Sequence, residues 1–310
     1  MIITFTPNPS VDQTLFVNAL AVGDVNRFHS PQLDPAGKGI NASRVIHRLG
    51  WPTIAFSFLA GEIGLIAERT LDEEGVQRHF VRVPGQTRMN VTVVDEASGT
   101  STSFYGPGPN VGPEHLAAVE GLLDFWLQAG KVLVLAGSLP PGVPIDIYAS
   151  YIRKARDKGV KTILDADGEP FRLGVEALPS LIKPNLPEAE RLLGRSLPSL
   201  SAAVAGAREL NGRGIETVVI SMAAEGAICV QGDRAWRAVP PQVERRSTVG
   251  SGDSLVAGLA VAMARGQDIV EGLRIGTAAG AATAMTNGTA LGTATEVETL
   301  LPQVQIEALA

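Results

Sequence analysis

Short apolar runs alternating with segments of helical periodicity are the feature that most constrains this fold. A strand that is apolar on both faces is typical of a parallel strand covered by helices. The apolar runs lie at 2–5, 53–58, 131–136, 160–165, 180–182 and 216–220, and the helical segments at 40–49, 62–74, 113–129, 144–158, 187–193 and 200–211. The sequence therefore predicts an α/β protein with a mostly parallel central sheet, whose ligands bind at the carboxyl ends of its strands.

Period-two segments interrupt this alternation. Residues 88–94 and 100–105 alternate polar and apolar side chains on either side of Asp95-Glu-Ala-Ser-Gly99, which is typical of a β-hairpin with one exposed face. Together with extended segments around 11–30, the hairpin predicts a small sheet appended to the main one. We therefore expect a single domain over 1–310, with a lid inserted from about 11–30 and 86–106.

The run Thr248-Val-Gly-Ser-Gly-Asp-Ser-Leu-Val-Ala-Gly258 predicts a glycine turn that opens a helix. The first N–H groups of a helix are unpaired and carry partial positive charge, so Gly250, Ser251 and Gly252 can bind an anion. Asp253 beside them would repel that anion unless it removes a proton from an attacking hydroxyl. We therefore expect phosphoryl transfer to an alcohol, the alternative being that Asp253 only caps the helix.

Composition excludes several partners. The net charge is −6 and no basic run would follow a nucleic-acid backbone, so no nucleic acid is expected. The uncharged stretch between Arg274 and Glu296 is too polar for a spanning helix, so no membrane is expected. A single cysteine, Cys229, and the lack of Lys or Arg before Arg27 predict a cytoplasmic protein without a signal peptide. The four histidines show no metal-ligand spacing.

Two segments carry a resemblance to a known family. Ala36-Gly-Lys-Gly-Ile-Asn-Ala-Ser43 and Ser247-Thr-Val-Gly-Ser-Gly-Asp-Ser254 resemble the two signatures of the PfkB family of ribokinase-like sugar kinases, and the likeness covers essentially the whole chain. Within that family the chain looks like the phosphofructokinase and tagatose-phosphate kinase branch. The resemblance implies a three-layer α/β/α fold, ATP and Mg²⁺ as cofactors, and in many members a monovalent cation.

The resemblance also implies roles for particular residues. Asp253 corresponds to the catalytic base, and Gly250, Ser251 and Gly252 to the anion hole, although the family usually has alanine at position 251. The positions implied to contact the sugar are Asp12, Gly37, Gly39 and Asn41. Those implied to contact the nucleotide are Asn185, Ser221, Gly226, Gly252 and Asn287, with Ala223 standing where the family commonly has glycine. Asn185 and Glu188 match the motif that helps to hold Mg²⁺, through water.

Lys38 and Arg88 bear on the substrate class. Two cations beside the acceptor, with Ser138 as a neutral donor, favour an acceptor that already carries a phosphate. Read without the resemblance, Lys38 is a solvated charge and Arg88 an ordinary lid-strand residue, while Asn185 and Glu188 are turn and helix-start residues. We interpret Asp165 and Asp167 as solvent-facing ends of a strand and assign them no role.

The expected reaction is ATP-dependent phosphorylation of a ketohexose monophosphate. Lys38 and the context Thr87-Arg-Met-Asn90 resemble the 1-phosphofructokinases, which implies fructose 1-phosphate, while Asp24-Val-Asn-Arg27 and Ser251 resemble the tagatose-6-phosphate kinases. A 6-phosphofructokinase is a third alternative, and a kinase of an unphosphorylated sugar or nucleoside, or a non-catalytic sugar-phosphate sensor, are more remote ones. The lid edges predict a homodimer by sheet pairing.

Overall fold

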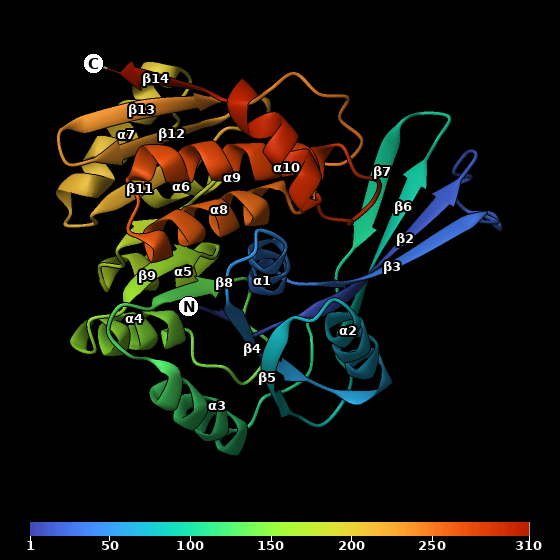
Figure 1. The fold of residues 1–310 in the computed structure, drawn as a ribbon. Coiled ribbons are helices and arrows are strands. Elements are labelled where there is room, and N and C mark those ends of the chain that lie inside the picture. The colour runs from blue at the N-terminus through green and yellow to red at the C-terminus, as the bar shows by residue number, and fades with distance from the viewer. Residues whose placement is uncertain (310) are drawn as a thin grey trace.

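The computed structural model describes residues 1–309, and its strands form a large sheet and a smaller one that projects from it (Figure 1). The large sheet has the order β14-β13-β12-β11-β10-β9-β8-β1-β4-β5. Its parallel strands are β1 (Ile2–Thr6), β4 (Thr53–Leu59), β5 (Gln77–Arg82), β8 (Val132–Ala136), β9 (Lys161–Asp165), β10 (Leu181–Ile182) and β11 (Thr217–Ser221). An antiparallel edge follows, made of β12 (Ala227–Gln231), β13 (Arg234–Val239) and β14 (Gln305–Leu309).

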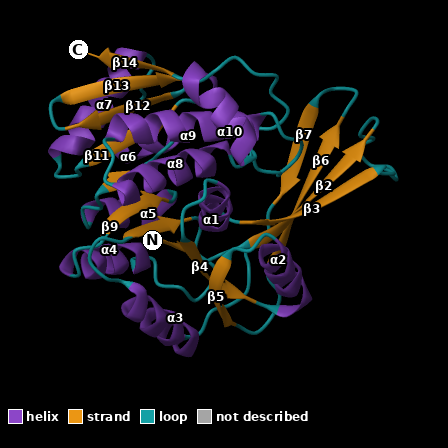
Figure 2. Ribbon diagram, viewed as in Figure 1, coloured by secondary structure: helices purple, strands orange, loops and turns teal. Residues whose placement is uncertain are grey.

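Helices cover both faces of this sheet, which confirms the predicted three-layer ribokinase-like fold (Figure 2). Because every residue of β1, β4 and β8 is buried, these central strands need apolar partners above and below. One face packs against α1 (Lys38–Arg48), α8 (Ser251–Arg265), α9 (Ile269–Ala284) and α10 (Ala294–Leu300). The other packs against α3 (Pro113–Trp126), α4 (Ile147–Asp157), α5 (Gly168–Glu176), α6 (Leu186–Leu193) and α7 (Leu200–Gly212).

The smaller sheet is the lid. It has the order β3-β2-β6-β7, with β2 (Ser10–Val17), β3 (Ser30–Ala36), β6 (Arg88–Asp95) and β7 (Thr100–Phe104). The helix α2 (Gly61–Glu73) contacts β2 and β3 near the base of the lid. In the parallel pair β2–β6, Ser10 lies opposite Arg88 and Asp12 opposite Asn90, so the lid brings two segments distant in the sequence to one place.

Several elements differ from the sequence prediction. The lid strand β3 covers Ser30–Ala36 and so extends beyond the expected 11–30 segment. The helix α4 begins at Ile147 instead of Pro144. Neither α5 nor β14 was predicted, because α5 is a short helix of nine residues and β14 is largely exposed and has no apolar run. These elements depend on tertiary contacts more than on their own periodicity.

The helix that carries Asp253 is fixed by close packing. A Cβ added to Gly258 in α8 would lie 2.3 Å from the Cα of Gly276 in α9, so only glycine allows the two helices to approach this closely. This contact fixes the position of α8 against α9. Among residues 1–309, none of the helices has the length and apolarity needed to span a bilayer.

Candidate active site

The glycine turn before α8 has the geometry that the sequence predicts. Gly250 adopts a left-handed conformation with φ of 79°, and α8 begins at Ser251, so the backbone N–H groups of Ser251 and Gly252 belong to the unpaired first turn. Asp253 follows in the same turn and is 9% exposed. Its Oδ2 accepts a hydrogen bond of 2.8 Å from Nδ2 of Asn41 on α1. Two predicted site residues from distant parts of the chain thus meet.

The environment of Asp253 raises the pKa of its carboxyl group to about 6. Burial is the larger cause and the neighbouring carboxylate of Asp165 the second, while Asn41, Lys38 and Lys183 act in the opposite direction. A carboxylate with a pKa near 6 is mostly ionised at neutral pH and is also a stronger base than a free aspartate. This is the property that a general base needs.

A buried charge cluster lies next to this carboxylate. Asp165, the last residue of β9, is 1% exposed, and its Oδ1 lies 2.8 Å from Nζ of Lys38. Its Oδ2 lies 3.3 Å from Nζ of Lys183, which is itself 4% exposed. Lys183 Nζ would lie 3.5 Å from a Cβ added to Gly252, so its ammonium group sits beside the glycine turn. Burial acts to raise the pKa of Asp165, but the two lysines outweigh it and hold that pKa below its usual range.

The prediction that Asp165 faces solvent is therefore wrong. Strand β10 lies next to β9, and its short length places Lys183 directly beside the end of β9, where the lysine covers the carboxylate. Asp167 does face solvent, with a side chain 58% exposed and an ion pair to Arg191. Sequence reasoning also gave Lys183 no role, although it is a polar residue directly after a strand.

Asn185 and Glu188 form the start of α6. Asn185 Oδ1 accepts a hydrogen bond from the N–H of Glu188, and Glu188 Oε2 accepts one from the N–H of Asn185, so the two residues cap the helix reciprocally. This cap is what the alternative, non-catalytic interpretation of both residues predicts. The second carboxylate oxygen of Glu188, Oε1, lies 3.7 Å from Nζ of Lys38. Among residues 1–309 no three His, Cys, Asp or Glu side chains come together as a metal cage. This donor set fits Mg²⁺ held through water and phosphate oxygens, which that ion prefers.

A cavity of about 720 Å³ opens onto this cluster. Its polar end includes Lys38, Asp165, Lys183, Asn185 and Asp253, together with the predicted nucleotide residues Ser221, Gly226 and Gly252. Its other end is lined mainly by apolar side chains that sequence reasoning missed, among them Leu197, Leu200, Pro240, Val243 and Ala281. A cavity lined by both charged and apolar side chains fits a nucleoside phosphate.

Asn287 is not part of that lining. It lies exposed in the loop between α9 and α10, where its backbone carbonyl accepts the N–H of Ala290. The next residue, Gly288, packs against the lid, since a Cβ there would lie 2.9 Å from Thr14 Oγ1 on β2. The structure thus places this loop between the nucleotide cavity and the lid.

A second cavity, of about 650 Å³, lies at the base of the lid. Arg88 and Ser138 both line it, as does Asn8 from the turn after β1. Asn8 Nδ2 donates to Ser138 Oγ at 3.2 Å, and Arg88 donates to the backbone carbonyl of Asn8 at 2.9 Å. The structure does not bring Lys38 together with Arg88 as predicted, because Lys38 is drawn to Asp165 and lines the first cavity instead.

Asp12 lies on β2 in the lid, and its Oδ1 accepts hydrogen bonds from Ser10 Oγ at 2.7 Å and Asn90 Nδ2 at 2.8 Å. Burial raises the pKa of Asp12, against the opposing effect of these two donors. Gly37 and Gly39 stand at the start of α1, where the chain passes close to the turn after β1. A Cβ at Gly39 would lie 2.5 Å from Thr6 Oγ1, so glycine is required for this close approach.

Comparisons with known proteins agree with this geometry. The model of a protein family described as "pfkB family carbohydrate kinase" matches residues 6–296. The chain is 35% identical to a protein named 1-phosphofructokinase in Bacillus subtilis (strain 168) over 310 residues, covering 100% of both chains. It is also 35% identical to a 1-phosphofructokinase of Vibrio cholerae, covering 99% of this chain and 97% of that protein.

Among solved structures, phosphofructokinase-2 from Escherichia coli in complex with substrates and products is similar, with a TM-score of 0.93, 31% identity and coverage of 97% of this chain and 98% of that one. Other structures of that protein are matched with the same coverage. They are a complex with potassium (TM-score 0.91, 30% identity), a complex with fructose-6-phosphate (TM-score 0.89, 29% identity) and a tetrameric inhibited form (TM-score 0.90, 30% identity). The match over nearly the whole length, together with the two signatures and the buried aspartate at the glycine turn, shows that the chain belongs to the pfkB family of carbohydrate kinases.

Proposed function

We propose that this protein is a 1-phosphofructokinase, which transfers the γ-phosphoryl group of ATP to fructose 1-phosphate and forms fructose 1,6-bisphosphate. The observation that carries the proposal is the full-length similarity to proteins named 1-phosphofructokinase. The buried Asp253 at an anion-binding turn supports the chemistry independently of that name. The whole of 1–310 acts as one kinase domain with a lid.

Asp253 is the catalytic base in this proposal. Its carboxylate takes the proton of the acceptor hydroxyl as the oxygen attacks the γ-phosphorus, and the bond from that phosphorus to the β,γ-bridging oxygen breaks to release ADP. The N–H groups of Gly250, Ser251 and Gly252 stabilise charge on the transferred group, and Lys183 adds a cation beside them. Asn41 keeps the carboxylate oriented through its hydrogen bond to Oδ2.

ATP occupies the larger cavity, with its phosphates toward Gly252 and Asn185 and its base among the apolar residues. Ser221 and Gly226 line the same cavity, and Asn287 reaches the nucleotide only if its loop moves. Mg²⁺ would be held near Glu188 and Asn185 through water, and when bound it neutralises charge on the phosphates. A monovalent cation is part of the proposal, since a similar protein was solved in complex with potassium.

The smaller cavity takes the phosphate that the acceptor already carries. Arg88 and Ser138 supply a cation and a hydroxyl there, and Asp12, Gly37 and Gly39 contact the sugar. Lys38 belongs to the transfer end of the site, where Asp165 and Glu188 hold its ammonium group and, against the effect of burial, raise its pKa.

The test is a coupled assay of ADP formation with fructose 1-phosphate, fructose 6-phosphate, tagatose 6-phosphate, fructose and ribose as acceptors. The proposal predicts the highest kcat/KM for fructose 1-phosphate and negligible turnover of the two uncharged sugars. A preference for fructose 6-phosphate, which a structurally similar protein was solved with, would instead favour a 6-phosphofructokinase. A preference for tagatose 6-phosphate would favour a tagatose-6-phosphate kinase.

The proposal includes a cytoplasmic homodimer that pairs through the lid. Large apolar side chains are exposed at 47% or more on both lid edges and the loops beside them, namely Val22, Val25, Phe28, Leu33, Phe104 and Tyr105. A patch of this kind marks a protein interface, and a tetrameric form of a similar protein supports self-association. Light scattering on the intact protein should give twice the monomer mass, and a monomer would refute the dimer.

A further inference from the structure

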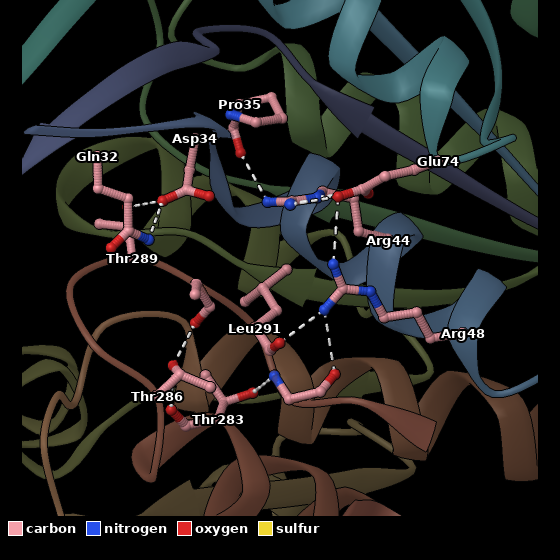
Figure 3. Close-up of polar contacts among 12 residues, drawn as sticks. Gln32, Asp34, Pro35, Arg44, Arg48, Glu74, Thr283, Thr286, Thr289 and Leu291 are labelled. Carbon is pink, nitrogen blue, oxygen red and sulfur yellow. Dashed lines mark hydrogen bonds and ion pairs between the residues drawn. The ribbon is translucent and has the colours of Figure 1, made fainter. Parts of the chain in front are cut away.

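The loop between α9 and α10, residues 285–293, is tied to the lid by side-chain contacts (Figure 3). Thr289 Oγ1 donates to Asp34 Oδ2 at 2.7 Å, and Gln32 Nε2 donates to the same oxygen at 2.7 Å. Asp34 and Gln32 belong to the lid strand β3, while Thr289 is 6% exposed. Since β3 pairs with β2 so that Asp34 lies opposite Asp12, this contact is one strand away from an acceptor-binding residue.

A second set of contacts connects the same loop to the same strand by a different route. Arg48 Nη1 donates to the backbone carbonyl oxygens of Leu291 at 2.6 Å and Gly292 at 3.1 Å. Arg48 also pairs with Glu74 at 3.2 Å, and Glu74 pairs with Arg44 at 2.5 Å. Arg44, only 3% exposed, donates to the carbonyl of Pro35 at 3.0 Å, next to Asp34 on β3. These contacts and those of Thr289 form a ring that the backbone closes, between Asp34 and Pro35 and between Thr289 and Leu291; Figure 3 shows its hydrogen bonds and ion pairs.

The loop is also connected to the anion-binding turn. The N–H of Gly292 donates to Thr283 Oγ1 at 3.0 Å, and that hydroxyl lies 2.8 Å from Ser254 Oγ. Ser254 in turn donates to the carbonyl of Gly250 at 3.0 Å. The side chain of Leu291 packs against the turn as well, since a Cβ on Gly250 would lie 2.7 Å from Leu291 Cδ2. A displacement of this loop would therefore disturb the turn that precedes Asp253.

We propose that loop 285–293 couples the position of the lid to the anion-binding turn, and that Thr289 is the positioning residue that makes this coupling. The inference rests on the proposed function, because it requires an acceptor beneath the lid and a nucleotide phosphate at the turn. When the acceptor draws the lid closed, β3 moves the loop through Thr289 and Asp34, and the turn is aligned for transfer. Binding at either site then strengthens binding at the other by the same factor.

The two routes in the ring have different strengths, which is why Thr289 rather than the arginines is the informative residue. Arg44 is buried and forms two hydrogen bonds to Glu74, so removing Glu74 leaves the charge of Arg44 buried and uncompensated, which endangers folding. The bond from Thr289 to Asp34 is a single hydroxyl donation. Valine at position 289 keeps the shape of threonine and deletes only that donor.

The experiment measures the Kd of the non-hydrolysable nucleotide AMP-PNP with Mg²⁺ by calorimetry, with and without saturating fructose 1-phosphate, at fixed potassium concentration. The ratio of the two Kd values is the coupling factor. It is compared among the wild type, Thr289→Val, Thr289→Ser and the control Thr299→Val, whose exposed hydroxyl bonds only within α10. Turnover of fructose 1-phosphate by the wild type is measured in parallel.

We expect Thr289→Val to lower the coupling factor about fivefold, the value of one hydrogen bond, while Thr289→Ser and Thr299→Val keep the wild-type factor. A wild-type factor of one, or an unchanged factor in a folded Thr289→Val, overturns the inference. A Thr289→Val variant with a lower melting temperature but an unchanged coupling factor also overturns the inference, because Thr289 then contributes only to stability. If Thr289→Val does not fold, Asp34→Ala, which removes the acceptor, is measured instead and the same two outcomes decide. Lack of wild-type turnover refutes the proposed function instead, so the two failures are distinguishable.

Discussion

Replacing Asp165 by asparagine tests the account of the charge cluster beside Asp253, the proposed base. The carboxylate lies 2.8 Å from Lys38 Nζ and 3.3 Å from Lys183 Nζ, and it helps to raise the pKa of Asp253 to about 6. The substitution keeps the size of the side chain and removes its charge. Both lysines then act on Asp253 without the negative charge between them.

The pKa of Asp253 should therefore fall. Burial is the larger cause of its rise from 3.8 to about 6, so Asp165 accounts for the smaller share, and the expected decrease is about one pH unit. Because the proposed base acts in its ionised form, activity should be lost as pH falls through this pKa, and the acid limb of kcat/KM should move from near 6 toward 5. The substitution also removes the carboxylate that pairs with the buried Lys183, so the free energy of unfolding should fall by about 3 kcal/mol.

The assay is the pH dependence of kcat/KM for fructose 1-phosphate between pH 4.5 and 9, with ellipticity recorded to confirm folding. Asp157→Asn, at the exposed end of α4, is the matched control and should leave the limb unchanged. An acid limb of Asp165→Asn that stays near 6 or moves upward would refute the assigned electrostatics. An Asp165→Asn variant that is as stable as the wild type would refute these electrostatics as well.

Three further predictions concern stability and substrate binding. Asp253→Asn should raise the free energy of unfolding at pH 8 by about 1–3 kcal/mol, because the raised pKa of Asp253, about 6, means that the folded state disfavours its charge. Urea titrations should show this gain vanishing as pH falls below 4. Arg88→Met should raise KM for fructose 1-phosphate about 10- to 100-fold with little change in KM for ATP, whereas equal changes in both would remove Arg88 from the acceptor cavity. Gly258→Ala should lower the free energy of unfolding by about 3 kcal/mol, since its Cβ would lie 2.3 Å from Gly276. The control Gly121→Ala, which has open space around it, should be neutral or slightly stabilising, and thermal melting measures both variants.

Local patterns were sufficient to predict those parts of the fold and site that depend on neighbouring residues. The central strands are apolar throughout because helices cover both faces, and this shows directly in the sequence. The glycine turn before α8 could also be predicted, because left-handed Gly250 and the first helical residues are adjacent in the chain. The family signatures made this assignment specific.

What the sequence could not supply depends on strand order and side-chain direction. Asp165 is buried because β10 lies beside β9, a neighbour relation that no local pattern encodes. Lys38 has a long, flexible side chain, and its direction was decided by Asp165, 127 residues away. The apolar side chains of the larger cavity come from segments far apart in the sequence, so none of these residues stands out alone.

The most direct test of the central claim is single-turnover phosphorylation of fructose 1-phosphate by Asp253→Asn, with the Kd values of both substrates measured on the same preparation. The asparagine keeps the shape of the side chain and can still accept the hydrogen bond from Asn41. If Asp253 is the base, the rate should fall by about 10³-fold while both Kd values stay within about threefold of the wild type. A rate within tenfold of the wild type would contradict the claim.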